Sequence, residues 1–285
     1  MTFMRRTLVA LSLVSLLVPV QVFAGALCVK TTGTGGALKH RTSGVCPTGW
    51  LKLGSLDTAT MTLQLSGVNL QIVSGSGATD GSTNGTGNLI IGYNEDTGAH
   101  DRTGSHNLIV GPEHTYSSYG GLVAGSDNTV SGTHASVSGG SGNAAAGTFA
   151  SVSGGLNNTA GGCPGSFCDG ASISGGQNNT AGTCGGSYCA AAAVSGGQNN
   201  TAGTCGGSYC TAASVNGGQN NAAGNCGGSY CEYATVSGGQ NNASGSCLGA
   251  NCSGAAIGGG AGLSVQVADE WHAAKAAGFP TATEY

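Results

Sequence analysis

Residues 171–191 read ASISGGQNNTAGTCGGSYCAA, and the same frame occurs five times in succession. Self-similarity at a short, fixed period is typical of a solenoid, in which each repeat forms one coil stacked on the previous one. Stacked coils form a rod with flat faces, which seldom contains a catalytic pocket. The five blocks are residues 150–170, 171–191, 192–212, 213–233 and 234–254.

Each coil is expected to contain a short strand at Ser-Val-Ser. Alternate residues of a strand point to opposite faces, so the valine points inward and the serines outward. The following Gly-Gly permits a tight reversal, and Asn-Asn tolerates a left-handed backbone and can stack as a ladder along the axis. One valine and one or two alanines per coil make a thin core, so we expect chains to associate, with a homotrimer as the first choice.

Less regular coils precede the repeats. Short apolar strands are expected at residues 88–92, 107–111 and 121–125. Leu108, Leu122 and Ser136 follow one another at equal steps, and Ser151 follows Ser136 at a step one position longer, so the basic coil has about 14–15 residues. The predicted fold class is all-β, a parallel β-solenoid (β-roll) of about 14–21-residue coils, with irregular first coils at 76–134 and regular repeats at 135–262.

An insert lengthens each of the later coils to about 21 residues, and every insert begins and ends with Cys. The ends of a hairpin lie close together, which suits a disulfide across its neck. A bridge between neighbouring coils, such as Cys168 to Cys184, is the rival, since strand spacing also permits it. The pairs predicted within inserts are Cys163 with Cys168, Cys184 with Cys189, Cys205 with Cys210, Cys226 with Cys231, and Cys247 with Cys252.

The amino terminus has the features of a signal peptide. Arg5-Arg6 precedes an apolar run, and small residues follow, so we expect cleavage after Ala24, with Ala26 as the alternative. Removal of residues 1–24 would change the formal net charge from −4 to about −6. No basic patch is present, which argues against a nucleic-acid partner. Twelve cysteines in an exported chain indicate disulfides rather than metal ligands, and no cofactor is expected.

Residues 25–75 are expected to form a small cap. A bridge between Cys28 and Cys46 would close it, although the two could also pair between chains. Two half-buried strands are expected within this region after Cys46, with alternating apolar residues at Met61, Leu63 and Leu65 and then at Val68, Leu70 and Ile72.

The tail, residues 263–285, is expected to contain a short helix over residues 267–277. Val267, Trp271 and Ala274 form an apolar stripe, and Gly278 and Pro280 would end the helix. Such a helix could cover the open edge of the last coil, or the tail could be frayed.

The repeat resembles the head repeat of trimeric autotransporter adhesins (YadA-like heads) over roughly residues 88–262. The resemblance implies a left-handed parallel β-roll that trimerises. Two departures stand out: Gly139 and Gly154 replace an apolar residue, and the short tail after Gly262 is too small for the family's stalk and membrane anchor. The matching residues are Val137, Gly139, Gly140, Asn143, Ala145 and Gly147, with Val152, Ile173, Val194, Val215 and Val236 as later equivalents of Val137.

Two groups of residues are candidates for function. The densest polar segment could bind a metal but has no ligand spacing, so outward loops are favoured and no metal site is predicted. An aromatic column precedes the second Cys of four inserts; it could form a contact stripe or pack on its own disulfide. The polar segment contains Glu95, Asp96, His100, Asp101, Arg102, His106, Glu113 and His114, and the column is Phe167, Tyr188, Tyr209 and Tyr230.

Catalysis is not expected. Cleavage of a polysaccharide needs paired carboxylates, but Asp169 and Glu232 are the only acids between residues 150 and 254, in different coils. The predicted function is an exported structural or adhesive module of the bacterial cell surface or extracellular matrix, which binds itself and an unknown extracellular receptor, matrix or glycan. The alternative is a solenoid that recognises polysaccharide or another ordered surface such as ice.

Overall fold

The computed structural model describes residues 25–30, 38–57, 59–162, 167–185, 188–206, 209–226, 230–247, 252–265 and 273–274. Within these ranges the secondary structure consists of β-strands, without an α-helix. The chain divides into two compact units, the first ending at Gln71 and the second beginning at Ile72. The all-β prediction is confirmed.

The first unit is a four-stranded antiparallel sheet. Cys28 in its central strand is fully buried, and a disulfide joins it to Cys46 with a Cα–Cα distance of 5.6 Å. The predicted pairing of these two cysteines within one chain is therefore confirmed. The strand order is β2 (Leu38–Arg41), β1 (Gly25–Lys30), β3 (Trp50–Asp57) and β4 (Thr62–Leu65).

The two alternating strands predicted after the disulfide are only partly correct. β4 forms, but it is an edge strand paired on one side with β3, and its Leu63 is 53% exposed rather than half-buried. The second predicted strand, residues 68–72, does not form, and Val68 and Leu70 are exposed. An alternating pattern predicts the period of a strand but does not supply a neighbouring strand to pair with. Without such a partner these residues bury little surface.

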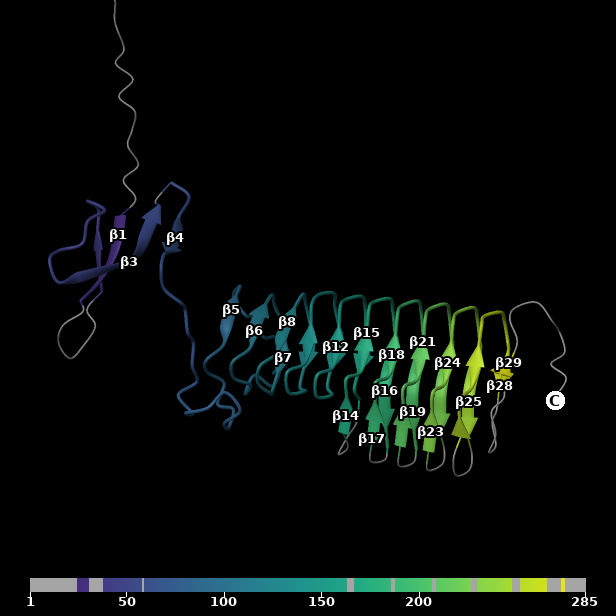
Figure 1. The fold of residues 1–285 in the computed structure, drawn as a ribbon. Helices are drawn as coiled ribbons and strands as arrows, with labels where there is room; N and C mark the ends of the chain where they lie inside the picture. The colour runs from purple at the N-terminus through teal and green to yellow at the C-terminus, as the bar shows by residue number, and fades with distance from the viewer. Residues whose placement is uncertain are drawn as a thin grey trace, which may run out of the picture. The chain divides into compact units, whose positions relative to one another are not determined.

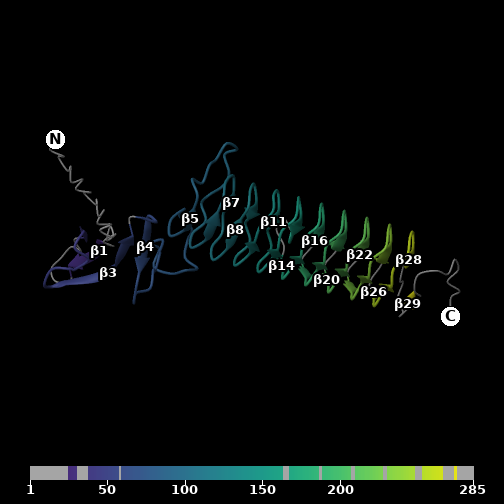
Figure 2. The same cartoon turned by 90° about the horizontal axis from the view of Figure 1, so that it is seen from above.

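The second unit is a parallel β-solenoid (Figures 1 and 2). Its largest sheet, the valine sheet, carries the Ser-Val strand of each coil. The eleven strands are β5 (Leu89–Ile91), β6 (Leu108–Val110), β8 (Leu122–Ala124), β10 (Ser136–Val137), β12 (Ser151–Val152), β15 (Ser172–Ile173), β18 (Ala193–Val194), β21 (Ser214–Val215), β24 (Thr235–Val236), β27 (Ala256–Ile257) and β29 (Ala273–Ala274).

The alanine sheet carries the second strand of each coil. A row of single bridges, which passes through Gln177 and Gln198, connects the coils along one edge. The nine strands are β7 (Thr115–Tyr116), β9 (Thr129–Val130), β11 (Ala144–Ala145), β13 (Thr159–Ala160), β16 (Thr180–Cys184), β19 (Thr201–Cys205), β22 (Ala222–Cys226), β25 (Ala243–Cys247) and β28 (Ser264–Val265).

The register follows the predicted period. Leu108 pairs with Leu122, Leu122 with Ser136, and Ser136 with Ser151. Where the first insert lengthens the coil, Val152 still pairs with Ile173. The insert therefore changes the length of a coil without shifting its register.

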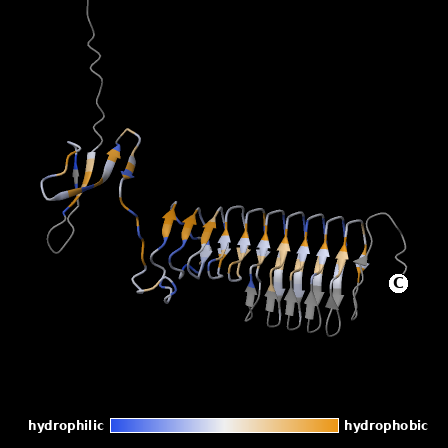
Figure 3. Cartoon of the chain, in the orientation of Figure 1, coloured by the Kyte–Doolittle hydropathy of each residue, from blue (hydrophilic) through white to orange (hydrophobic). Residues whose placement is uncertain are grey.

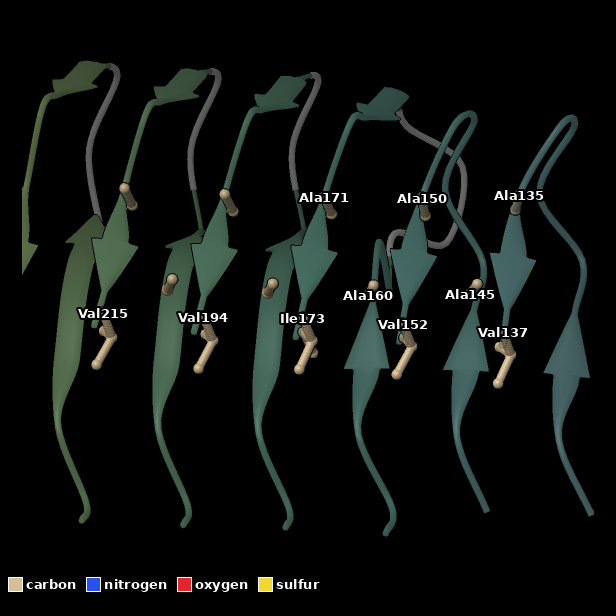
Figure 4. Packing of buried hydrophobic residues seen from close by; sticks show 14 of the residues in the cluster. Ala135, Val137, Ala145, Ala150, Val152, Ala160, Ala171, Ile173, Val194 and Val215 are labelled. Atoms are coloured by element: carbon tan, nitrogen blue, oxygen red, sulfur yellow. The ribbon is translucent and has the colours of Figure 1, made fainter. Parts of the chain in front are cut away.

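The core is one layer of small side chains between the two sheets. Val137 and Val152 are fully buried in the valine sheet, and Ala145 and Ala160 are fully buried in the alanine sheet. Figure 4 shows the inward Val or Ile of successive coils in one row and, in a second row, Ala135, Ala150 and Ala171, each immediately before the strand of its coil. The predicted inward valine and opposing alanine are confirmed.

A ladder of buried asparagines runs along the solenoid. In a typical coil the Nδ2 of Asn200 donates to the carbonyls of Gly196 (2.8 Å) and Gly218 (3.0 Å), and its Oδ1 accepts the backbone N–H of Asn221 (3.0 Å). The asparagine side chains are buried, where an unpaired polar group would cost free energy. The ladder residues from the third coil on are Asn128, Asn143, Asn158, Asn179, Asn200, Asn221 and Asn242.

The other repeated polar residues have backbone roles. Asn199, the first residue of its Asn-Asn pair, has a left-handed φ of 55°, which Asn tolerates well. A Cβ on Gly197 would lie 2.2 Å from the carbonyl oxygen of Gly218 in the next coil, so only glycine fits there. The Gly-Gly-Gln-Asn-Asn segment thus allows coils to stack at backbone contact.

The inserts form a third parallel sheet, the insert sheet, rather than separate hairpins. The first Cys ends a lengthened strand of the alanine sheet, as Cys184 does in β16, and the second lies in a strand of the insert sheet, as Cys189 does in β17. A sheet at this position was not predicted. Its strands are β14 (Phe167–Asp169), β17 (Tyr188–Ala190), β20 (Tyr209–Thr211), β23 (Tyr230–Glu232) and β26 (Cys252–Ser253).

The prediction of a helix over residues 267–277 is wrong at Ala273 and Ala274, the two residues of this segment that the structure describes. Ala273 and Ala274 form β29, which pairs in parallel with β27 through Ala256 and Ile257. The backbone groups at the edge of β27 need partners, and a strand supplies them in a way that a helix cannot. The other residues of this segment lie outside the described ranges.

We predict that the ladder asparagines stabilise the fold far more than the exposed glutamines. Replacing Asn200 by Ala removes three hydrogen bonds made by a fully buried side chain and should lower the free energy of unfolding by about 2–3 kcal/mol. Gln198→Ala, in the same coil, removes a side chain that donates to Gln177 (3.5 Å) and accepts from Gln219 (3.2 Å); because both hydrogen bonds are exposed to water, this variant should cost less than about 1 kcal/mol. Equal losses in urea denaturation would contradict the proposed role of the ladder.

Candidate functional surfaces

An apolar face covers the outer side of the valine sheet at its first three strands. In the regular coils the two outward positions of this sheet carry mostly Ser, as in Ser151 and Ser153. In β5, β6 and β8 they carry aliphatic residues, and these strands are the most hydrophobic of the sheet in Figure 3. The apolar face consists of Leu89, Ile91, Leu108, Val110, Leu122 and Ala124.

The apolar face is partly open to solvent. Leu89 is 42% exposed and Ile91 is 54% exposed, while the residues of β6 and β8 are half-buried. Ile90 occupies the inward position of the first coil, opposite the fully buried Ile109, yet is 42% exposed because no coil covers it. The sequence predicted these three strands but not the apolar face on their outer side. The signal for this face is that three consecutive apolar residues replace the Ser-Val-Ser of the regular coils.

The predicted aromatic column is aligned in the backbone. Phe167 pairs with Tyr188, Tyr188 with Tyr209, and Tyr209 with Tyr230 in the insert sheet. Their side chains lie outside the part of the chain that the structure describes. The column therefore remains a candidate contact stripe.

A second aromatic row was not predicted. The ring of His134 makes an edge contact with Tyr119 (centroids 5.3 Å apart) and stacks on Phe149 (5.6 Å). Phe149 is 62% exposed, and Gly170, at the equivalent position of the next coil, has no side chain to cover the other face of the ring. This row, Tyr119, His134 and Phe149, leaves an aromatic ring face open to a partner.

The insert cysteines are aligned in two columns. Cys184 pairs with Cys205 in the alanine sheet, and Cys189 pairs with Cys210 in the insert sheet. The first cysteines of successive inserts are thus neighbours in one sheet and the second cysteines are neighbours in the other. The two strands of one coil that carry them, β16 and β17, also lie against each other. The side chains of these cysteines lie outside the described residues, so both the bridges within inserts and the rival bridges between coils remain predictions.

The structure brings together three residues of the predicted polar segment. His100 Nδ1 lies 2.8 Å from Asp96 Oδ1 and 3.6 Å from Glu113 Oε2. On the other side of the ring, His100 Nε2 lies 3.7 Å from Oδ1 of Asp127, a residue outside the predicted segment. The hydrogen bonds from the His100 ring and backbone N–H lower the pKa of Asp96, so this carboxyl group is ionised at neutral pH.

The rest of the polar segment holds the backbone together. Arg102 donates to the carbonyls of Asn94, Glu95 and His114. Asp101 accepts hydrogen bonds from Thr103, which lower the pKa of Asp101. These residues are structural in the solenoid.

The two remaining histidines of the segment also serve the backbone. The Nε2 of His106 accepts the N–H of Ser74 at 3.0 Å. His114 is fully buried and takes the place of a ladder asparagine: its Nδ1 accepts the N–H of Asn128 (3.2 Å) and its Nε2 donates to the carbonyl of Val110 (3.1 Å). Burial lowers the pKa of His114, consistent with the neutral ring that this pattern requires.

The sequence matches no known protein-family model and no curated protein. The similarity to the adhesin head repeat therefore rests on the repeat residues alone. In the part of the chain that the structure describes, there is no helix with the length and hydrophobicity needed to cross a membrane.

We predict that asparagine can replace His114 but an aliphatic residue cannot. His114→Asn restores the residue that the later coils use and should change the free energy of unfolding by less than about 1 kcal/mol. His114→Leu leaves the buried N–H of Asn128 and carbonyl of Val110 without this partner and should cost about 2–3 kcal/mol. Urea denaturation of the two variants checks this; a better tolerated leucine would exclude the ladder role.

Proposed function

We propose that the chain is an exported structural module of the bacterial cell surface or extracellular matrix that acts as an adhesive homotrimer. The β-solenoid supplies a rod with a repeated polar surface, and the disulfide between Cys28 and Cys46 suggests an oxidising, extracellular environment. The signal-peptide pattern at residues 1–24 supports export through a membrane. The observation that carries the proposal is the apolar face on an otherwise polar rod.

The apolar face supports self-association. It contains six aliphatic residues and no group that could form a side-chain hydrogen bond, so its best partner is another aliphatic surface. The same face on other copies of the chain meets this requirement, and burying one Leu or Ile side chain contributes about 1.5–3 kcal/mol. Association would also cover a second face of a solenoid whose own core is thin. Two further copies around a common axis would form the trimer that the adhesin resemblance implies.

Adhesion is assigned to the two aromatic features. The exposed ring of Phe149 could stack on a sugar or an aromatic side chain, and the column from Phe167 to Tyr230 offers a similar group in four successive coils. We infer that these rings contact the extracellular receptor, matrix or glycan.

We propose that the module is not an enzyme. Within the regular repeats, residues 150–254, Asp169 and Glu232 are the only acids, and they share one register position of the insert sheet with two strands between them. Three strand spacings amount to about 14 Å, whereas paired carboxylates of glycoside hydrolases are at most about 9.5 Å apart.

A second candidate function is recognition of an ordered surface such as a polysaccharide or ice. It is favoured by a column of exposed hydroxyl groups on the valine sheet, which includes Ser138, Ser153, Ser174 and Ser195 at strand spacing. The threonine column of the alanine sheet is shorter. It is continuous through Thr159, Thr180 and Thr201 and then changes to Ala222.

We predict that the mature chain sediments as a trimer and that a charge on the apolar face dissociates it. Val110→Asp should yield monomers in analytical ultracentrifugation, because an unpaired carboxylate would be buried in the interface. Ser153→Asp adds the same charge at the equivalent outward position of a regular coil and should leave the trimer intact. A wild-type chain that is monomeric at micromolar concentrations would exclude this assembly.

We also predict that the mature chain shows no freezing hysteresis. Ice binding requires regular contact over a wide face, and the threonine column is interrupted at Ala222 and Ala243. Measurement of the gap between melting and freezing temperatures checks this. A gap that disappears in Ser174→Asp would establish the ordered-surface function instead of the adhesive one.

A further inference from the structure

We propose that Asp96, His100 and Glu113 bind one divalent transition-metal ion of the zinc class, and that Asp127 orients the histidine. The three ligand atoms, one from each side chain, lie within 4.8 Å of one another. This site is separate from the apolar face and the aromatic features, so it does not depend on the proposed adhesive function.

Glu113 and Asp127 occupy the same left-handed position of consecutive coils, and Asp96 lies two residues after the corresponding position, Asn94, of the coil before them. The backbone N–H of Glu113 donates to the carbonyl of Glu95, which precedes Asp96, and the N–H of Asp127 donates to the carbonyl of Pro112, which precedes Glu113. In later coils this place carries uncharged residues, such as Asn199 and Asn220, whose side chains hydrogen-bond to each other. The three carboxylates lie close to one ring, that of His100, and repel one another, and a cation among them would reduce this repulsion.

The neighbouring cation, Arg102, neutralises these carboxylates only in part. Arg102 is a neighbouring guanidinium, with its Nε 3.8 Å from Asp96 Oδ2. Its N–H groups donate to backbone carbonyls. His100 is the residue on which the carboxylates converge, from both sides of its ring.

The geometry suits a small ion with nitrogen and oxygen ligands. Zinc lies about 2.0–2.2 Å from such ligands, so two ligand atoms of one ion are at most about 4.4 Å apart. A small rotation of the side chains would bring the present atoms to this spacing, and His100 would lose its contact to Asp96 in exchange for the ion. One imidazole with two carboxylates favours zinc over calcium, which prefers oxygen ligands alone.

The ligands are already held in position. Backbone N–H groups of Gly98 and His100 donate to Asp96, and that of Thr97 donates to Glu113 (2.8 Å). The side chains of His100, Asp96 and Glu113 are 19%, 29% and 21% exposed, so an ion can enter from solvent. Asp127 Oδ1 lies 3.7 Å from the far nitrogen of His100, so a small movement of this exposed carboxylate would let it accept a hydrogen bond and orient a metal-binding histidine.

The test is zinc titration of the full oxidised chain by isothermal calorimetry, together with the thermal midpoint with and without zinc. We expect one zinc ion per chain and a rise in the midpoint on binding. His100→Gln should weaken binding at least about tenfold, and Asp127→Asn by about tenfold. Glu95→Gln, which removes a neighbouring exposed charge outside the site, should bind as the wild type does.

Glu113→Asn separates metal binding from folding. It introduces the residue that later coils carry at this left-handed position and removes one exposed hydrogen bond, that from Thr97, so the zinc-free protein should have a thermal midpoint close to that of the wild type, while zinc binding and the zinc-dependent rise should be lost. Absence of binding at millimolar zinc, binding that His100→Gln and Glu113→Asn leave intact, or binding of calcium in preference to zinc would each overturn the proposal.

Discussion

The buried asparagine amide is the interaction on which this solenoid depends. A core of one valine and two alanines per coil excludes too little water to hold so many glycines in place, so the coils need a directional link. The asparagine provides it: one side chain closes the turn of its own coil and also bonds to the next coil as both donor and acceptor, as Asn200 does with Gly196, Gly218 and Asn221. Because these amides are buried, any slip of the register would leave them unpaired, and the stacking becomes specific.

The same requirement explains the glycines and the exceptions. Coils can share an amide only if their backbones approach closely, and Gly197 and its equivalents permit this. The buried histidine of the ladder, His114, succeeds because a neutral imidazole presents an acceptor and a donor much as an amide does. The polar segment, which was predicted to form outward loops, therefore has two kinds of member: residues such as Arg102 and His114 that bond to the backbone, and a cluster around His100 whose side chains also contact one another.

The repeat made most of the fold predictable. The period gave the coil length and register, and strand alternation gave the buried valines. Alternation was misleading at Val68 and Leu70, because period alone does not supply a neighbouring strand. The apolar stripe of the tail predicted a helix, yet Ala273 and Ala274 pair with the open edge of β27. The His100 cluster could not be read from spacing, because its carboxylates become neighbours only when irregular coils are aligned; the loop that carries His100 has no counterpart in the repeat.

The register across the insert boundary has a consequence for how such a chain can change. Among the described residues each strand of the solenoid pairs with strands of the adjacent coils, and Val152 pairs with Ile173 as Val137 pairs with Val152 in a plain coil. One complete repeat, such as residues 171–191, can therefore be duplicated or deleted without breaking the strand pairing of the remaining coils. Each such event would change the length of the solenoid by about 4.8 Å. Unequal recombination within the gene would therefore change the length of the solenoid in steps of one repeat.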